Sequence, residues 1–322
     1  MRIIQFVNKK KVRRVGIVED NSIFSLDHVY STYELFFFAE KNNLKIKDAI
    51  SKLTTSDRED YEIIINENRV LVPLDHPDPY HTWITGTGLT HLGSAKSRDE
   101  MHTQANGNSV NQQTDSIKIY QEGVMNGKFK DSKPGVQPEW FYKGNGLTAV
   151  ASGNPLSLPS FALDGGEEPE IAGLYIINSK GKPCRIGFSL ANEFSDHKME
   201  KMNYLYLAHS KLRQCSFGPE LLLDDLPGNI KGTTQIIRNN KVIWEKEFLT
   251  GEDNMSHNIA NLEYHNFKYD LFRQPKDVHV HFFGTSVLSF TDDIKVLGGD
   301  VFKIEAEHMG RPLINSLHEE VN

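Results

Sequence analysis

Cysteine is scarce in this sequence, and neither copy has the spacing of a metal-binding motif. Cys184 and Cys215 are the two cysteines among 322 residues, and they form no CxxC pair. Two isolated thiols indicate a reducing compartment, so we expect a cytoplasmic protein. We also expect both side chains to be buried and to act as small hydrophobic residues, because free cysteine usually behaves in this way.

Long apolar runs and an excess of positive charge are also absent. No stretch has the ~18 apolar residues of a membrane span, and the first residues, MRIIQFVNKKKVRR, lack the apolar segment of a signal peptide. The net charge is −7 with histidine neutral, which disfavours nucleic acid as a partner and leaves a small molecule open. The basic run Lys9–Arg14 could be a nucleic-acid or localisation patch. Strand-like segments on both sides of it favour a hairpin turn instead.

The first part of the chain, residues 1–78, is predicted to form a small α/β domain. Strands at 2–7 and 14–18 would pair as a hairpin. A helix would begin at Ser31, because Ser31 and Glu34 have the spacing of a capping box. The proline-bearing stretch that follows the domain is typical of a boundary.

The remainder, residues 79–322, is predicted to be a larger, mainly β domain. From residue 139 onward, short β-rich runs alternate with turn signals, and one helix is expected at about 255–269. Residues from about 86 to 135 are expected to form a mobile lid, because the stretch TQANGNSVNQQTDS (103–116) has almost no apolar side chains for a core. An inert surface insertion is the alternative. The predicted fold class is therefore α+β, mainly β.

Two further motifs point to weaker possibilities. The stretch GTGLTHLG (86–93) is rich in glycine, but its third glycine comes too late for the GxGxxG of a dinucleotide site. The stretch HVHFF places His279 and His281 on one face of a strand, where they could bind zinc. Since no further ligand pattern stands nearby, we favour a half-exposed strand face for these two histidines.

Carboxylates gather at the start of one apolar stretch, GGEEPEIAGLYII (165–177). In a strand, Glu168 and Glu170 would point to the same side about 7 Å apart, while Glu167 would point the other way and be solvated. Two carboxylates aimed at one point repel each other unless a cation lies between them. The nearby stretch NEFSDH offers a third acid, Glu193 or Asp196.

Oxygen ligands of this kind suit Mg²⁺ first, and then Mn²⁺ or Ca²⁺. From these residues alone, a metal site and a set of solvated charges at strand ends remain equally acceptable interpretations.

The order of the motifs resembles the fumarylacetoacetate hydrolase superfamily over roughly residues 85–315. The matching motifs are the Glu-x-Glu pair, Asn-Glu-Phe-Ser, a lysine ahead of Phe-Gly-Pro, and a late Gly-Thr turn. The resemblance implies the metal ligands Glu168, Glu170 and Glu193, and it also implies functional roles for Lys211, Gly284 and Thr285. Most relatives have Asp at the position of Glu193. A fold with a β-roll or sandwich domain after a small N-terminal domain, and a homodimer, are also implied.

Within the superfamily, the chain is most similar to the bacterial branch that dehydrates 2-keto-3-deoxy sugar acids of the arabinonate or xylonate type. Glu139-Trp140-Phe141-Tyr142-Lys143 and Ser97-Arg98-Asp99 carry this similarity. It implies that Ser97 and Arg98 bind sugar hydroxyls or the carboxylate, that Gly284 and Thr285 hold the carboxylate, and that Lys143 and Lys211 neutralise oxyanions or relay protons. A lysine can relay a proton only if its pKa is lowered.

The activity implied is a Mg²⁺-dependent dehydration of a 2-keto-3-deoxy pentonate, of L-arabinonate or D-xylonate type, to 2-oxoglutarate semialdehyde through a metal-stabilised enolate. The base is not identified. A C–C bond hydrolase that releases pyruvate from a 2,4-diketo-3-deoxy acid is an alternative, although His91, Glu100 and His102 do not match the acid–base pair that such hydrolases carry. A sugar-acid binding protein without catalytic activity is the third possibility.

Overall fold

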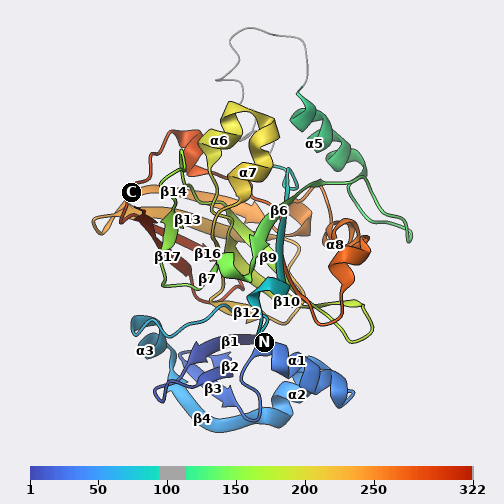
Figure 1. Ribbon diagram of the computed structural model, residues 1–322, viewed down its shortest axis with the longest axis vertical. Coiled ribbons are helices and arrows are strands. Elements are labelled where there is room, and N and C mark those ends of the chain that lie inside the picture. The colour runs from blue at the N-terminus through green and yellow to red at the C-terminus, as the bar shows by residue number, and fades with distance from the viewer. Residues whose placement is uncertain (94–113, 321–322) are drawn as a thin grey trace.

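The computed structural model describes residues 1–93 and 114–320, and it has the predicted α+β, mainly β, fold (Figure 1). Ser97, Arg98, Glu100 and His102, together with most of the predicted lid, lie outside the described residues. None of the described helices is long and apolar enough to cross a membrane.

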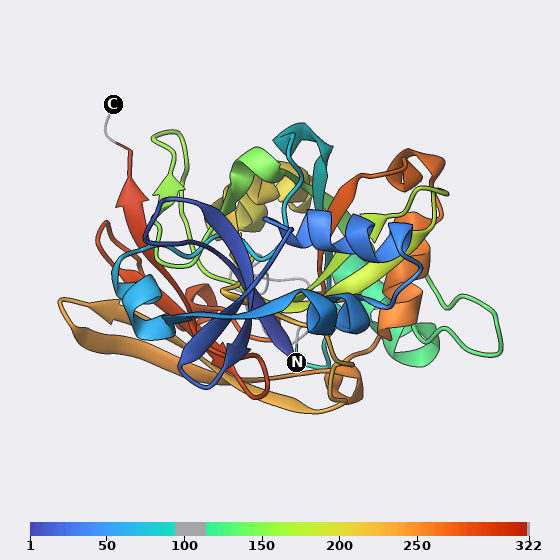
Figure 2. The same ribbon diagram turned by 90° about the horizontal axis from the view of Figure 1, so that it is seen from below.

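The N-terminal segment contains a β-hairpin, a third and a fourth strand, and three helices (Figure 2). In chain order these are β1 (Arg2–Val7), β2 (Arg13–Glu19), β3 (Ser22–Leu26), α1 (Thr32–Lys41), α2 (Ile46–Leu53), β4 (Thr54–Asp60) and α3 (Tyr61–Asn66). The predicted hairpin is confirmed, because β1 and β2 pair antiparallel around the basic turn. Ser31 caps α1 by accepting from the backbone N–H of Glu34 at 3.0 Å, and Glu34 in turn accepts from the N–H of Tyr30 rather than from that of Ser31.

A large mixed sheet carries the hairpin and the centre of the molecule. Its further strands are β5 (Thr82–Gly88), β6 (Glu139–Asn145), β7 (Ala149–Val150), β9 (Pro169–Ile177), β10 (Pro183–Asn192), β11 (Cys215–Phe217), β12 (Glu220–Leu222) and β15 (Val278–Phe282). The strand order is β4-β3-β2-β1-β12-β10-β9-β15-β5-β6. Because β1 pairs with β12, the sheet runs without a break across the predicted boundary at residue 78, and the division into two domains stays a prediction.

A smaller sheet, antiparallel except for the parallel pair β17 and β8, packs against part of the large one. Its strands are β8 (Leu156–Leu158), β13 (Ile230–Arg238), β14 (Lys241–Thr250), β16 (Val301–Ala306) and β17 (Leu313–Glu319), and their order is β14-β13-β16-β17-β8. Phe188 and Leu190 of β10 share one apolar core with Phe248 and Ile304 of this sheet. The burial of both inner faces holds the two layers together as in a sandwich.

The remaining helices lie at the ends and edges of the sheets (Figure 1). They are α5 (Asp115–Asn126), α6 (His197–Met202), α7 (Leu207–Lys211) and α8 (Ile259–Phe267). Single helical turns occur at Pro79–His81, Gly146–Thr148, Tyr204–Tyr206, Glu252–Asn254, Asp270–Arg273 and Ser289–Asp292. The helix expected at about 255–269 is therefore present but shorter, whereas α5 was not predicted and occupies part of the stretch assigned to the lid.

Strand β9 explains where the functional region lies, because all nine of its residues are buried. It pairs with β10 on one side and with β15 on the other, and apolar layers cover both of its faces. A run such as PEIAGLYII, without polar alternation, is typical of a strand buried on both faces. Side chains at the start of β9 are thus held rigidly by the centre of the fold.

Two predictions about burial need correction. His279 and His281 on β15 are completely buried, not half-exposed, because β15 is an inner strand and the ring of Phe267 packs 5.1 Å from that of His279. Cys215 is buried as expected, but Cys184 near the start of β10 is only half-buried.

Candidate metal centre

The pairing of β9 with β10 brings Glu193 to Glu168 and Glu170, which precede it in the sequence by 25 and 23 residues. Glu170 lies opposite Ala191 in the register, and Glu193 follows the last residue of β10. The backbone N–H of Glu193 then donates to the carbonyl of Glu168 at 3.0 Å. As a result, Glu168, Glu170 and Glu193 each offer an oxygen within 4.8 Å of those of the other two, and all three side chains are buried.

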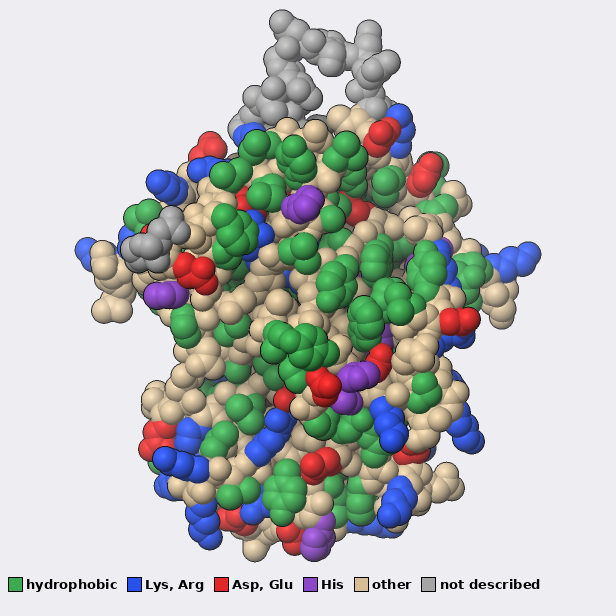
Figure 3. Space-filling model, in the orientation of Figure 1, with side chains coloured by type: hydrophobic (Ala, Val, Ile, Leu, Met, Phe, Trp, Pro, Cys, Tyr) green, Lys and Arg blue, Asp and Glu red, His purple; other side chains and the backbone are tan. Residues whose placement is uncertain are grey.

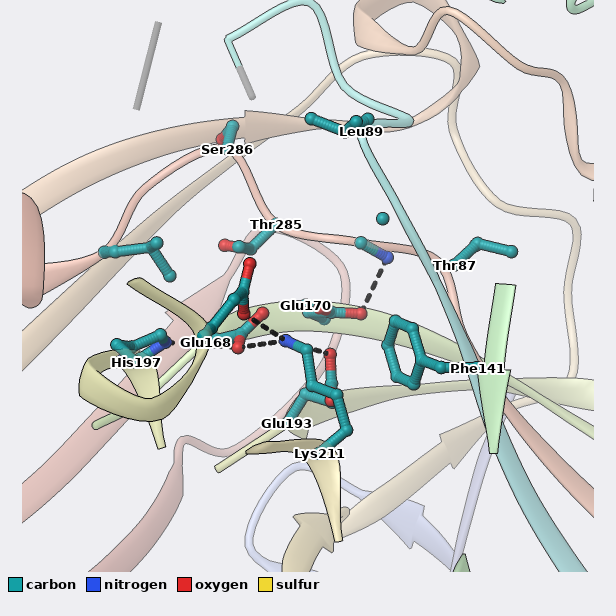
Figure 4. Close-up of a pocket in the computed structure, with 14 residues that line it drawn as sticks. Thr87, Leu89, Phe141, Glu168, Glu170, Glu193, His197, Lys211, Thr285 and Ser286 are labelled. Atoms are coloured by element: carbon teal, nitrogen blue, oxygen red, sulfur yellow. Dashed lines mark hydrogen bonds and ion pairs between the residues drawn. The ribbon is translucent and has the colours of Figure 1, made fainter. Parts of the chain in front are cut away.

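Each carboxylate has different hydrogen-bond partners (Figure 4). Glu168 binds the ammonium of Lys211 and Nε2 of His197, the latter at 3.1 Å. Glu170 accepts from the backbone N–H of Gly284 at 2.7 Å through Oε2, while its Oε1 is buried with no hydrogen-bond partner. Glu193 lies 3.4 Å from Nζ of Lys211. The group is therefore held in place from outside, with an unpartnered oxygen at its centre.

Burial and mutual repulsion shift the pKa values of these acids. Burial and the charges of Glu193 and Glu168 raise the pKa of Glu170 well above its usual range. Burial and the charge of Glu168 also raise the pKa of Glu193, to about 7, against the opposing effect of Lys211. Burial alone would raise the pKa of Glu168 too, but Lys211 and His197 hold it well below its usual range. Two of the three carboxylates are thus short of positive charge.

The residues present fit a hard divalent cation. The unpartnered Oε1 of Glu170 is a buried polar atom that costs about 1–3 kcal/mol unless something binds it. Three converging carboxylates without cysteine or histidine form a ligand set of the kind that Mg²⁺ prefers. A divalent cation would satisfy that atom and offset the repulsion that raises the pKa values of Glu170 and Glu193.

The two predicted catalytic lysines occupy different positions. Lys211, at the end of α7, lines the cavity and reaches the carboxylates directly. Burial would lower its pKa, but Glu168, Glu193 and Glu200 outweigh burial and raise it, which favours the charged ammonium in the metal-free protein. Of the two roles that the resemblance implies for Lys211, neutralising an oxyanion suits a charged ammonium, and both roles stay predictions.

Lys143 of β6 lies behind the ligands instead of facing the cavity. It donates to the carbonyl of Phe194 and lies 3.5 Å from Oε1 of Glu193, and it is completely buried. Burial lowers its pKa. Its position suits support of Glu193 better than direct contact with a substrate.

The late Gly-Thr turn closes another side of the cavity. Gly284 has a φ of +99°, and a Cβ there would lie 2.2 Å from Oγ1 of Thr90, so only glycine fits. Thr285 lines the cavity, and its hydroxyl hydrogen-bonds the carbonyls of Pro169 and Val287 at 2.9 Å. Gly284 thus contacts Glu170 and Thr285 contacts Pro169, and their roles toward a substrate stay predictions.

The expectation that Glu167 is solvated is wrong. Its side chain is completely buried and accepts from the backbone N–H of Ser289 at 3.0 Å and from its hydroxyl at 2.7 Å. The segment after β15, which carries Ser289, covers Glu167 and supplies both of these donors. Its contacts fasten the segment that follows Thr285 to the start of β9.

Asp196, the alternative third acid, does not join the metal group. It caps α6 by accepting from the N–H of Met199 at 3.0 Å, and it forms a buried ion pair with Arg213 at 2.9 Å. Its role is thus to fix the start of α6.

Two residues of the site were not predicted from sequence, His197 and Glu200 of α6. Both line the cavity, and both are almost completely buried. His197 packs closely against the backbone, because a Cβ on Gly166 would lie 2.7 Å from its Nδ1. The signal available in the sequence was their spacing of three residues, which places two polar side chains on one face of a helix next to the NEFS motif.

The cavity itself is small and partly open. Its volume is about 30 Å³, about the space of one ion or one water molecule. The ring of Phe141 forms one wall, 5.1 Å from Nζ of Lys211, and Leu89 and Ser286 lie near the rim (Figure 4). A floor of three buried acids and one ammonium suits a cation first, and a small anionic molecule only beside that cation.

Comparison with known proteins finds similarity in structure only. No family model matches the chain, and no curated protein matches its sequence. Among solved structures, the apo form of 2-keto-3-deoxy-D-arabinonate dehydratase superposes with a TM-score of 0.72 at 20% identity, covering 100% of both chains. The same enzyme complexed with magnesium and 2,5-dioxopentanoate gives 0.71 at 20% identity, again over 100% of both chains. A 5-carboxymethyl-2-hydroxymuconate delta-isomerase from Mycobacterium smegmatis gives 0.61 at 14% identity, over 99% of this chain and 100% of that one. The chain thus has the fold of these enzymes.

Proposed function

We propose that this protein belongs to the fumarylacetoacetate hydrolase superfamily and is a Mg²⁺-dependent dehydratase of a 2-keto-3-deoxy pentonate. The observation that carries the proposal is the buried group of Glu168, Glu170 and Glu193, with its unpartnered oxygen, at the floor of a small cavity. The fold supports it, because a protein of the same fold is a 2-keto-3-deoxy-D-arabinonate dehydratase that binds magnesium. The product would be 2-oxoglutarate semialdehyde.

Glu168, Glu170 and Glu193 would hold the ion. When bound, Mg²⁺ supplies a Lewis acid next to the 2-keto group and so favours loss of a proton from C3. The ammonium of Lys211 stands beside the same group and would neutralise negative charge that develops on the substrate. Thr285 and the backbone of Gly284 lie on the adjacent side, where they would position the substrate carboxylate. Ser97 and Arg98 remain proposed contacts to the sugar hydroxyls.

The hydrolase alternative has less support from the described residues. It needs an acid–base pair near the substrate to activate water. His91 is buried, its Nε2 hydrogen-bonds Oγ1 of Thr250 at 2.8 Å, and it is not among the residues that line the cavity. His91 therefore does not supply that pair, while Glu100 and His102 lie outside the described residues, and we favour elimination of water because the fold is that of a known dehydratase.

A panel of substrates tests the proposal. Purified protein with Mg²⁺ would be incubated with 2-keto-3-deoxy pentonates of each configuration and with 2,4-diketo-3-deoxy acids, and the products followed by NMR. We expect the semialdehyde from at least one pentonate and no reaction after chelation of the metal. Release of pyruvate from a diketo acid would instead identify the hydrolase, and binding without turnover of either class would identify a binding protein.

We also propose a homodimer, as the resemblance implies. Exposed apolar side chains gather around α6 and α7 on the face seen in Figure 3, where the groove lined by Phe161, Met202 and Leu212 has a volume of about 510 Å³. Surface patches of this kind often mark protein interfaces. Light scattering after size-exclusion chromatography would distinguish a dimer from a monomer of 36.6 kDa.

The two isolated cysteines support the proposal of a cytoplasmic location.

A further inference from the structure

One acid that lines the cavity, Glu200, is not part of the candidate metal centre. Of the described residues that line the cavity, four are acids, and three of them form the metal group. The fourth, Glu200, is 2% exposed. It comes from helix α6, whereas the metal group comes from the start of β9 and the end of β10, so it belongs to a different wall.

Helix α6 holds Glu200 in a fixed position. Its backbone N–H donates to the carbonyl of Asp196 at 3.2 Å, and Asp196 is itself fixed by its ion pair with Arg213. His197 and Glu200 are three residues apart and share the face of α6 that lines the cavity, while Lys198 is exposed to solvent. Glu200 therefore belongs to a prearranged wall of the site, as a proton-transferring group must.

The two polar side chains closest to Glu168 both contact this ligand. The ammonium of Lys211 and Nε2 of His197 both bind Oε1 of Glu168. The second ring nitrogen of His197 lies close to the backbone of Gly166 and is buried without a hydrogen-bond partner. Oε2 of Glu200 lies 3.9 Å from Nζ of Lys211, the ammonium that also contacts Glu168. Glu200 is thus a carboxylate beside the site's cation, within the cavity and outside the ligand set.

We infer that Glu200 is the catalytic acid–base residue of this site, which removes the C3 proton of a 2-keto acid and returns it to the departing C4 hydroxyl. The inference rests on the proposed dehydratase and names the base that sequence motifs did not identify.

A single carboxylate can perform both proton transfers of the reaction. Glu200 takes the proton from C3, and the C–H electron pair forms the C2–C3 double bond of the enolate. When the enolate collapses, that pair forms the C3–C4 double bond, the C4–O bond breaks, and the leaving hydroxide takes the proton from Glu200 to depart as water. Glu200 ends as the carboxylate that it was at the start, and no further reactant is needed. Tautomerisation of the product then gives the terminal aldehyde.

The first half of this sequence can be measured alone. Pyruvate is the simplest 2-keto acid with exchangeable C3 protons, and it has no hydroxyl to eliminate. In D₂O with Mg²⁺, enolisation by the protein exchanges its methyl protons for deuterium, which NMR follows as loss of the methyl signal. We expect the wild-type protein to catalyse this exchange.

The variant Glu200→Gln keeps the size of the side chain and removes its ability to accept a proton. We expect its exchange rate to fall about 10²–10⁴-fold, as is typical for loss of a general base, while Mg²⁺ affinity measured by calorimetry stays within about threefold. Glu200→Asp, which restores a carboxylate on a shorter side chain, should recover part of the rate. Lys198→Gln is the matched control, because it removes a charge from an exposed position of the same helix and should leave the rate unchanged.

The outcomes separate this inference from the proposed function. Exchange by Glu200→Gln at the wild-type rate would overturn the inference. An equal loss of exchange and of Mg²⁺ affinity would also overturn it, because Glu200 would then act through the metal site. Absence of exchange in the wild type would overturn it as well. A wild-type protein that exchanges pyruvate through Glu200 but dehydrates no pentonate would support the inference while removing the proposed substrate class.

Discussion

At the scale of single residues, the site depends on how a few buried charges offset one another. Lys211 is the cation closest to the carboxylates, and it is 2% exposed. It binds Glu168 and lies between that residue and Glu193, so it partly offsets their negative charge when no metal is bound. In a variant without this lysine, the three acids would lack a compensating positive charge, so the stability of the protein should depend more strongly on a bound cation.

We therefore expect Lys211→Met to destabilise the metal-free protein by about 3–5 kcal/mol, the usual cost of leaving buried charges without their partner. Saturating Mg²⁺ should raise the melting temperature of this variant more than that of the wild type, because the ion then supplies the missing charge. Differential scanning calorimetry with and without Mg²⁺ measures both effects. An equal shift in both proteins would show that the carboxylates do not require a cation, and Lys198→Met controls for the loss of an exposed lysine.

Glu167 gives a second test at this scale, because its burial was not expected from sequence. Glu167→Ala should lower the free energy of unfolding by about 2–4 kcal/mol, since it leaves the buried N–H and hydroxyl of Ser289 without an acceptor. Urea unfolding measures the loss. A solvated glutamate would change stability by less than about 0.5 kcal/mol, as expected for the exposed control Glu122→Ala.

At the scale of elements, the two buried histidines of strand β15 should lower the stability of the folded protein at acid pH. Burial lowers the pKa of His281 to about 3, and burial together with the neighbouring His281 lowers that of His279 to about 3. Both values lie below the ~6.5 of an exposed histidine, so the unfolded chain binds protons first as the pH falls. Each histidine then reduces stability progressively between pH 6.5 and pH 3, by up to about 1.4 kcal/mol per pH unit.

The double variant His279→Asn, His281→Asn should therefore lose less stability than the wild type between pH 7 and pH 5. Asparagine keeps a polar atom near the position of Nδ1, where His281 meets Oγ1 of Thr85 at 2.7 Å. Urea unfolding at pH 7, 6 and 5 gives the slope of stability against pH for each protein. Parallel slopes would show that the two histidines do not titrate as their burial implies.

The elements also show what could be predicted from sequence and what could not. The spacing of Glu168 and Glu170, and the apolar strand before Glu193, predicted three acids at neighbouring strand ends, and the fold class followed from the alternation of β-rich runs and turns. Glu167 and His279 were misjudged for one shared reason. Period-2 alternation tells which residues share a face of a strand, but whether that face meets water depends on the layers packed against it.

The helical side of the site was missed for a different reason. Helix α6 is only six residues long, and its stability comes from the Asp196 cap and from the buried ion pair with Arg213 rather than from a periodic apolar face. Without a sequence pattern that predicts the helix, its inward residues His197 and Glu200 could not be assigned to the cavity. Helix α5 was not predicted either, because the polar stretch before it led us to assign the whole region to a loop.

At the scale of the whole molecule, the large sheet joins distant parts of the chain around the site. Glu220 of β12 illustrates this, since it binds Arg2 of the N-terminal hairpin at 2.7 Å and accepts from the backbone N–H of Arg311 near the C-terminal strand at 2.9 Å. The three converging acids, Glu168, Glu170 and Glu193, lie at the neighbouring ends of β9 and β10 in this arrangement. A rigid and costly cluster of acids at the centre of a fold is best explained by an ion that offsets its charge.

Titration of Mg²⁺ into the metal-free protein by isothermal calorimetry tests that explanation most directly, with wild type and Glu170→Gln compared at the same pH. Glutamine preserves the shape of the side chain and removes the charge at the oxygen that lacks a partner. We expect the wild type to bind one Mg²⁺ per chain and the variant to bind it at least about tenfold more weakly, a difference of about 1.4 kcal/mol. Equal affinity in the two proteins, or no binding by the wild type, would contradict the assignment of Glu168, Glu170 and Glu193 as the metal centre.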